Sequence, residues 1–208
     1  MNLKRFLIRG CAVMMLLAAS LSAMTGCANN SGESSQNLVY SPYVPENKVD
    51  ENQPGEEKNS SVGKSLQYQS KVTASLDKIV EFDKCATQML RFYVAQFTIT
   101  NTSSDPLDCS ALTHFNVRVG GEDDPELSSN VSALVYSRKY YTKTGSDLKI
   151  LNQAIESGQT VTGYIYFAAP AKTDSLQVVY TPYKYFNTDK LIFDVADADV
   201  THYTESFE

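Results

Sequence analysis

The sequence contains no tryptophan and only two histidines, His114 and His202, among its 208 residues. The lack of tryptophan weakens the case for a sugar-stacking surface, because its large ring is the most extensive aromatic face available. The two histidines are far apart and have no cysteine or carboxylate at ligand spacing, so they form no compact ligand set for zinc or copper. The sequence therefore predicts no bound metal and no cofactor.

Motifs typical of catalysis are also missing. No nucleophile elbow accompanies the histidines, and the pair Gly120-Gly121 is followed by acidic residues that would repel a phosphate. We therefore expect that the protein is not an enzyme. An envelope enzyme, or an enzyme accessory, whose site assembles only in the folded chain is the alternative. A pocket that groups either histidine with a carboxylate and a hydroxyl would favour that alternative.

Basic residues are too few for a protein that binds nucleic acid. The chain has 18 lysines and arginines against 24 aspartates and glutamates. Residues 1–26 contain three of the basic residues and no acidic one, so a chain that begins at residue 27 carries 15 against 24, a formal charge of −9. Such a chain is repelled by phosphate backbones and by anionic lipid head groups. We expect neither nucleic-acid binding nor electrostatic adhesion to a membrane.

The apolar run at residues 11–23 is too short for a helix that crosses a bilayer, which takes about 20 residues. It follows a basic head formed by Lys4, Arg5 and Arg9, and it precedes a region of small residues. This three-part order is typical of a secretory signal peptide. The sequence therefore predicts that residues 1–26 are removed.

The end of this signal, Met24-Thr25-Gly26-Cys27, resembles the bacterial lipobox, whose last two positions are Gly or Ala and then Cys. The resemblance implies cleavage before Cys27 and attachment of lipid to its sulfur. Two acyl chains anchor a protein stably where one does not, since each buried methylene contributes about 0.8 kcal/mol. An ordinary secretory signal, cut nearby without lipidation, is the alternative. The expected location is the extracytoplasmic face of the cell membrane.

Residues 27–64 are rich in Asn, Ser, Glu, Gly and Pro and contain few large apolar side chains. Such a segment cannot bury enough surface to offset the entropy of ordering the chain. We interpret it as a lipidated cysteine followed by a disordered stalk, with a reach of about 35 Å for a flexible linker of this length. Residues 65–208 have the size of one ordinary domain.

Beyond residue 65, apolar side chains recur mostly at every second position, and Val, Ile, Tyr, Phe and Thr are enriched, as in half-buried strands. In the clearest run, residues 92–100, one face carries Tyr93, Ala95, Phe97 and Ile99. Residues 115–119 and 160–167 alternate in the same way. Further predicted strands cover residues 66–76, 131–136, 176–181 and 191–195.

Turn signals rich in Asn, Ser, Asp, Gly and Pro separate these runs, at residues 101–106, 120–125, 157–158 and 169–170. Seven or more short strands with frequent turns favour an all-β fold, an antiparallel β-sandwich. A short helix or irregular turn is expected only at residues 83–91 and 146–155.

Three segments carry a resemblance to a known group of proteins. Residues 93–107, 155–167 and 176–180 resemble the strand with its asparagine turn, the glycine turn with its apolar strand, and the following strand of bacterial lipoprotein domains of unknown function. Those domains are similar to the immunoglobulin-like, immunoprotective extracellular antigens of mycobacteria. The resemblance implies an immunoglobulin-like β-sandwich and leans toward a Gram-positive envelope. It transfers no active site, because its motifs are structural.

Cys85 and Cys109 are the cysteines that remain within the predicted domain. An extracytoplasmic pair invites a disulfide, which would stabilise the domain by roughly 3 kcal/mol in the chain-entropy model. The strand predicted between them argues against it, because ten extended residues span roughly 33 Å and a disulfide needs α-carbons within about 7 Å. The disulfide therefore stays the less favoured of two open alternatives.

Two acidic clusters are candidate calcium ligands, because hard cations take several carboxylate oxygens. Neither matches a calcium-loop pattern, so solvated acidic loops are the favoured interpretation and a cation-dependent binding module is the alternative. One cluster comprises Glu122, Asp123, Asp124 and Glu126, and the other comprises Asp194, Asp197 and Asp199.

Tyr164 and Tyr166 form the candidate binding surface. If Ile165 and Phe167 face the core, the pleat turns these two tyrosines to the opposite face. Tyrosine suits an interface because it combines an apolar ring with a polar tip, although it is also simply a good strand residue. We expect a lipid-anchored domain that binds an envelope or extracellular protein or glycan.

Overall fold

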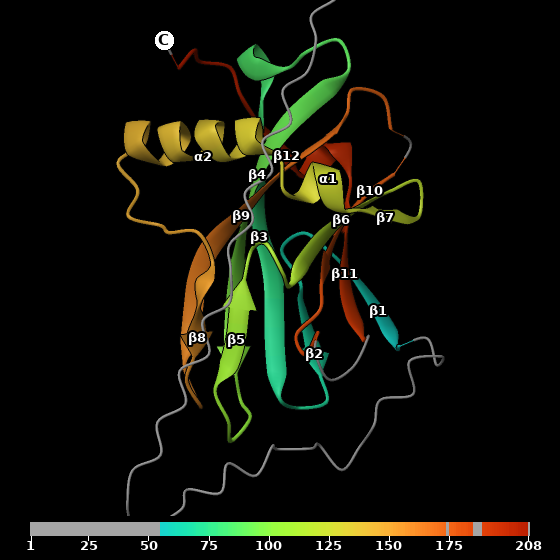
Figure 1. Ribbon diagram of the computed structural model, residues 1–208, viewed down its shortest axis with the longest axis vertical. Helices are drawn as coiled ribbons and strands as arrows, with labels where there is room; N and C mark the ends of the chain where they lie inside the picture. The colour runs from blue at the N-terminus through green and yellow to red at the C-terminus, as the bar shows by residue number, and fades with distance from the viewer. Residues whose placement is uncertain (1–54, 174, 185–188, 208) are drawn as a thin grey trace, which may run out of the picture. The chain divides into compact units, whose positions relative to one another are not determined.

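The computed structural model describes residues 55–173, 175–184 and 189–207, whose strands pack as two sheets face to face (Figure 1). The all-β sandwich predicted from the alternating pattern is thereby confirmed. The predicted signal peptide, Cys27 and most of the predicted stalk lie outside the described residues.

The first sheet has five strands and is antiparallel except at one edge, where β1 runs parallel to β11. In spatial order the strands are β1 (Glu57–Ser61), β11 (Lys190–Val195), β10 (Leu176–Tyr180), β6 (Phe115–Val119) and β7 (Glu122–Asp124).

The second sheet is also antiparallel except at an edge, where the last strand of the chain pairs in parallel with β3. Its order is β12 (Val200–Tyr203), β3 (Val72–Phe82), β4 (Leu90–Asn101) and β9 (Thr160–Pro170), and β2 (Ser65–Tyr68) adds to β3. A separate ladder joins β5 (Leu107–Ser110) and β8 (Asn152–Ile155). Short 3-10 turns follow β3 and β11, at η1 (Asp83–Cys85) and η2 (Asp197–Asp199).

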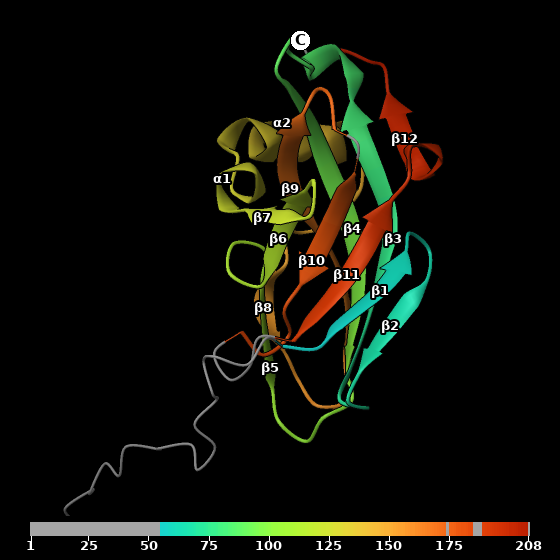
Figure 2. The ribbon, with the colours of Figure 1, turned by 90° about the vertical axis from the view of Figure 1, so that its right-hand side faces the viewer.

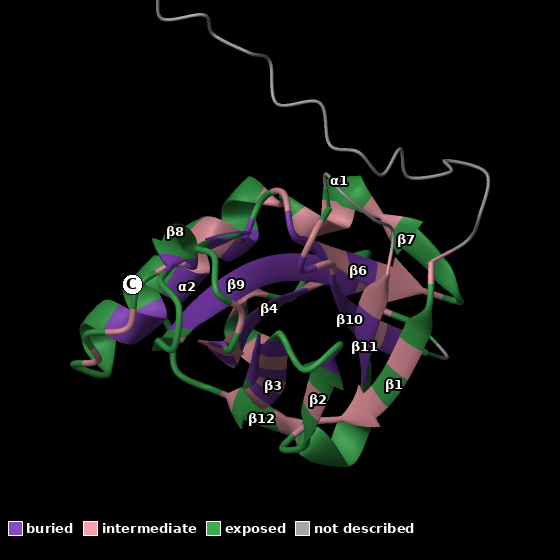
Figure 3. Cartoon of the chain, turned by 90° about the horizontal axis from the view of Figure 1, so that it is seen from below, coloured by how far each residue is buried: buried purple, intermediate pink, exposed green. Residues whose placement is uncertain are grey.

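The main core lies between the two sheets, where Figure 3 shows buried residues on the facing strands. Tyr93, Ala95, Phe97 and Ile99 of β4 all point into it, which confirms the predicted face. The opposite face of the same strand is buried in its first half, where Phe92 and Val94 belong to a second cluster. The central strand is therefore covered on both sides near its start.

The second cluster is covered by a helix where the sequence predicted a strand. The segment from residue 131 forms α2 (Val131–Lys143), preceded by the short α1 (Pro125–Ser128), so the strand predicted at 131–136 is wrong. Asn130 caps the helix by accepting a hydrogen bond from the Ala133 amide. The buried positions 133, 137, 140 and 141 follow helical spacing, which a search for alternation misses.

Helix α2 packs on the outer face of β4 and β9 (Figures 1 and 2). Residues near the C-terminus complete this layer, because Phe207 stacks on Tyr136 and meets Phe82 edge to face. Within the described residues, no helix combines the length and the apolar character needed to cross a bilayer. The described residues thus form three layers: the two five-stranded sheets enclose one core, and α2 covers a second one.

Two boundaries at the start of the domain differ from the predicted ones. Strand β1 lies within the predicted stalk, because its polar sequence gives no strand signal and only pairing with β11 orders it. The single strand predicted at residues 66–76 is a hairpin of β2 and β3. Gln69 and Ser70 take positive φ values of 43° and 54° there, the backbone that a tight hairpin turn requires. The irregular turn expected at residues 83–91 contains η1.

Candidate ligand-binding cleft

A cleft of about 450 Å³ opens between the two sheets at the end of the sandwich where β3 finishes and β4 begins. Its apolar lining comes from Leu176, Val195 and Val200, which continue the core outward. The polar lining comes from β3, β4, η2, β12 and the connection between β9 and β10. It comprises Glu81, Arg91, Tyr93, His202, Lys172, Thr173, Ser175 and Asp197.

A β-bulge directs Glu81 into this cleft. Even-numbered residues of β3 face the main core up to Leu76, and the register with β4 then shifts between Leu76 and Lys78. After the shift, the odd-numbered Ile79 packs in the main core, while Val80 and Phe82 pack under α2. The carboxylate of Glu81 therefore projects between the sheets, in line with a core residue.

Arg91 and Tyr93 meet this carboxylate from β4. Glu81 Oε1 accepts a hydrogen bond from Arg91 Nη1 at 2.9 Å, and Glu81 Oε2 accepts one from the Tyr93 hydroxyl at 3.1 Å. Arg91 also donates from Nε to the carbonyl of Ala171 at 3.2 Å. The Glu81 side chain is only 5% exposed and that of Arg91 is 42% exposed. A buried carboxylate at the base of the cleft is thus paired with a guanidinium that reaches solvent.

Charge and burial at the base of the cleft shift the pKa values of Arg91 and Tyr93. The Glu81 carboxylate raises the pKa of Arg91 above its ordinary value, so the guanidinium is charged at any physiological pH. Burial, and then the adjacent Glu81, raise the pKa of Tyr93 well above its usual range. Tyr93 is therefore a hydrogen-bond donor in the cleft and not a general base.

His202 reaches the mouth of the cleft from β12, where it is the parallel register partner of Glu81. Its Nδ1 lies 2.9 Å from Oδ1 of Asp83, and this hydrogen bond raises the pKa of His202. Ligand atoms of Glu81, Asp83 and His202 all lie within 4.8 Å of one another. No carboxylate stands at ligand spacing from either histidine in the sequence, and the fold brings two of them to His202 from 119 and more residues away.

His114 lies in a second, smaller pocket of about 240 Å³ near β5 and β8, together with Asp108, Ser110 and Thr113. Its Nδ1 is 3.2 Å from the Ser110 amide and 2.9 Å from the Thr113 hydroxyl. Burial lowers the pKa of His114, which holds the ring neutral at pH 7. Each histidine thus shares a pocket with a carboxylate and a hydroxyl, the arrangement expected of a site that assembles only in the folded chain.

The neutral state of His114 predicts a loss of stability in acid. Since its folded pKa is lowered, the unfolded chain binds more protons as the pH falls below about 6.5, and stability falls with it. We expect His114→Gln to reduce the drop in melting temperature between about pH 7.5 and pH 5. His202→Gln is the comparison variant: because the pKa of His202 is raised, its protonation stabilises the fold in acid, and its removal should enlarge the drop instead of reducing it. Identical pH profiles for the wild type and His114→Gln would contradict the prediction.

Cys85 and Cys109 are both free, so the alternative of a disulfide between them is wrong. Cys85 lies in η1 at the end of β3, whereas Cys109 lies in β5, at the other end of the sandwich in Figure 1. The length of β4 separates them, as the strand pattern indicated. Burial raises the pKa of Cys109 to about 12, which keeps it a thiol and not a nucleophile.

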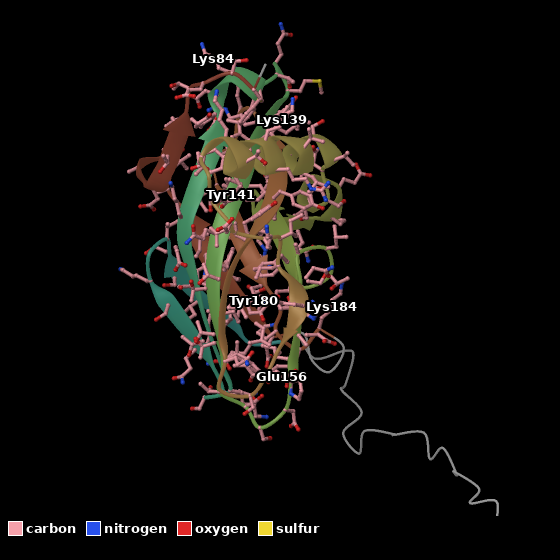
Figure 4. The ribbon with its side chains drawn as sticks, turned by 90° about the vertical axis from the view of Figure 1, so that its left-hand side faces the viewer. Lys84, Lys139, Tyr141, Glu156, Tyr180 and Lys184 are labelled. Atoms are coloured by element: carbon pink, nitrogen blue, oxygen red, sulfur yellow. The ribbon has the colours of Figure 1, made fainter. Side chains whose placement is uncertain are left out.

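Tyr164 and Tyr166 do point away from the main core, but they do not form an exposed surface. Helix α2 covers them, and they are 4% and 6% exposed. The ring of Tyr164 stacks at 4.4 Å on that of Tyr141, a buried residue of α2 that is labelled on the underside of the helix in Figure 4. The predicted tyrosine surface is therefore an internal packing layer, because the segment predicted as a strand is the helix above it.

Three members of the two acidic clusters have other partners. Asp123 binds Arg118 at 2.8 Å and Lys190 at 2.7 Å, and Asp124 caps α1. Asp194 accepts a hydrogen bond from the Gln177 amide. Within the part of the chain that the structure describes, the carboxylates that converge with a histidine are Glu81 and Asp83, neither of which belongs to the predicted clusters.

Comparisons with known proteins give fold neighbours without an assigned function. A Bacillus subtilis protein named "putative lipoprotein (ycdA)" is 18% identical with a TM-score of 0.45, and the match covers 67% of this chain and 40% of that one. The yjhA protein of Bacillus subtilis is 12% identical with a TM-score of 0.40, over 68% of this chain and 99% of that one.

An uncharacterized β-sandwich protein of Clostridium difficile is also 12% identical, with a TM-score of 0.39, over 68% of this chain and 96% of that one. No curated protein matches the chain. The model of a protein family described as "Domain of unknown function (DUF4352)" matches residues 60–192, from within β1 to within β11. The chain therefore belongs to the DUF4352 family.

Proposed function

We propose that this protein is a lipoprotein of the extracytoplasmic membrane face that binds a polar ligand through the cleft at the end of its β-sandwich. The signal pattern and the lipobox-like Cys27 support the anchor. The ligand that we propose is a polar segment of an envelope or extracellular protein or glycan. Similarity to the mycobacterial antigens stays a prediction from the sequence motifs.

The observation that carries this proposal is the ionisable set at core-facing positions. On β3, Glu81 points between the sheets like Ile79, which precedes it by two residues. On β4, Arg91 and Tyr93 lie on the same face as Ala95, which continues the row into the core. Burying an ion pair contributes little to stability compared with apolar side chains of similar volume. Cores are normally apolar, so charged side chains at core-facing positions are expected mainly at functional sites.

The position of the cleft suits a tethered binding domain. The cleft residues come from the upper ends of β3, β4, β9 and β12 in Figure 1, whereas β1, the first described strand, begins in the lower half (Figures 1 and 2). A chain anchored at its N-terminus therefore enters the domain from the end away from the cleft. An anchor on that side would leave the cleft open to a partner.

A catalytic role is the second candidate, because His202 and Asp83 form a histidine–carboxylate pair beside the cleft. Such pairs orient a general base in hydrolases. Among the described residues, Asp83 is the hydrogen-bond partner of the His202 ring, and no hydroxyl or thiol is hydrogen-bonded to it. We therefore favour binding over catalysis.

The proposal is tested by photo-crosslinking in intact cells. A benzophenone amino acid replaces Lys172, which is exposed at the rim of the cleft, and in a second strain it replaces Glu156, which is exposed at the opposite end (Figure 4). We expect an adduct from position 172 and none from position 156. Glu81→Gln combined with Arg91→Met should abolish that adduct. Equal adducts at both positions, or an adduct that survives the double variant, would argue against a binding cleft.

A further inference from the structure

Three side chains at the mouth of the cleft, Glu81, Asp83 and His202, form a compact group of metal-ligating atoms. One ligand atom from each lies within 4.8 Å of the other two, and the Nδ1–Oδ1 distance between His202 and Asp83 is 2.9 Å. We propose that this group binds a divalent transition-metal ion of the zinc class. The proposal goes beyond ligand binding by the cleft and does not depend on it.

Donor chemistry selects the class of ion. One imidazole with two carboxylates is a ligand set typical of zinc and its first-row neighbours, whereas calcium and magnesium prefer oxygen ligands alone. At metal–ligand bonds of about 2.0–2.2 Å, two ligand atoms of one tetrahedral ion lie about 3.3–3.6 Å apart. The His202–Asp83 distance of 2.9 Å is within about 0.7 Å of that separation, and the Glu81 oxygen lies within 4.8 Å of both atoms, so small side-chain movements would complete the set.

The fold itself places the three ligands. Glu81 is near the end of β3, and Asp83 follows two residues later as the first residue of η1. His202 arrives from the far end of the chain because β12 pairs in parallel with β3, in the register that sets His202 beside Glu81. Glu81 and Asp83 therefore lie together at the end of β3. His202 is held beside them because its strand, β12, is hydrogen-bonded to β3 through the backbone.

Arg91 and Tyr93 act as outer-shell partners of Glu81. Each donates one hydrogen bond to a different oxygen of the carboxylate, and a carboxylate oxygen has a second lone pair that remains available to a metal. Metal-binding carboxylates are usually held by such hydrogen bonds, which fix their orientation. Arg91 also offsets one of the two carboxylate charges, so Glu81, Asp83, Arg91 and a neutral His202 together carry one net negative charge.

The site also has an open side. His202 is 51% exposed and Asp83 is 32% exposed, while Glu81 is almost fully buried. An ion can therefore enter from the mouth of the cleft and meet the buried carboxylate last. With three protein ligands, a tetrahedral ion keeps one position toward the 450 Å³ cleft for water or another ligand.

The test uses the mature lipoprotein purified in detergent without a histidine tag, titrated with ZnCl2 by calorimetry and with CoCl2 by visible absorption. We expect one ion per chain and, for Co²⁺, the absorption bands of a tetrahedral complex. Glu81→Gln, Asp83→Asn and His202→Ala should each weaken zinc binding by about 100-fold or more, and Tyr93→Phe by about 10-fold, as for an outer-shell partner.

Three matched variants keep the test specific. His114→Gln removes the other histidine, Asp197→Asn removes a carboxylate elsewhere in the cleft, and Cys85→Ser removes the less buried thiol. All three should bind zinc as the wild type does, and unchanged melting temperatures would show that each ligand variant is folded. Absence of stoichiometric zinc binding overturns the proposal. So does binding that survives in all three ligand variants, that disappears in Cys85→Ser, or that is matched by CaCl2.

Discussion

Replacing Phe97 with alanine is expected to lower the free energy of unfolding by about 3–5 kcal/mol. Phe97 is fully buried in the middle of β4, the strand that pairs with both β3 and β9. Its ring meets Phe115 at 5.0 Å and Phe193 at 5.3 Å, both edge to face and both from the opposite sheet. The substitution therefore removes buried apolar area and leaves a cavity at the contact between the sheets.

Urea denaturation measures this loss as a fall in the midpoint with an unchanged slope. Phe97→Leu should cost clearly less, since it refills most of the cavity. Leu112→Ala should change stability by no more than about 0.5 kcal/mol, because Leu112 is exposed. A Phe97→Ala variant as stable as Leu112→Ala would show that the two sheets do not share a common core.

Replacing Cys27 with serine is expected to release the protein from the membrane or to leave residues 1–26 uncut. The sulfur of Cys27 is the predicted point of lipid attachment, and a mature chain with a formal charge of −9 has no electrostatic attraction to anionic head groups. Two acyl chains would supply the whole attachment, at about 0.8 kcal/mol for each buried methylene. Once the lipid is lost, we therefore expect no second anchor to hold the mature chain at the membrane.

Detergent-phase partitioning and intact mass measure this effect. The wild type should enter the detergent phase with the mass of residues 27–208 plus lipid, and Cys27→Ser should leave that phase or retain its signal. Cys11→Ser is the matched control, since Cys11 precedes the apolar core of the signal and should be removed with it. A Cys27→Ser variant that has lost residues 1–26 and still enters the detergent phase, or wild-type protein that keeps residues 1–26, would contradict the lipid anchor.

The sequence was most informative where one face of a strand is simply apolar. The alternation in β4, β6 and β9 predicted these strands and their core faces correctly, because a pleated strand turns successive side chains to opposite sides. It failed for α2, since Tyr and Val suit strands in isolation, and only packing on Tyr164 and Tyr166 decides in favour of the helix. It also failed for β1, whose polar residues are ordered by pairing with β11.

The sequence by itself determined the signal pattern, the acidic charge and the sandwich, because each depends on composition or on neighbours a few residues apart. Only the tertiary structure decided the candidate site. The bulge after Leu76 turns Glu81 inward, and the parallel pairing of β12 with β3 brings His202 to it across more than a hundred residues. Register and bulges are set by long-range backbone hydrogen bonds, which leave no periodic trace in the sequence.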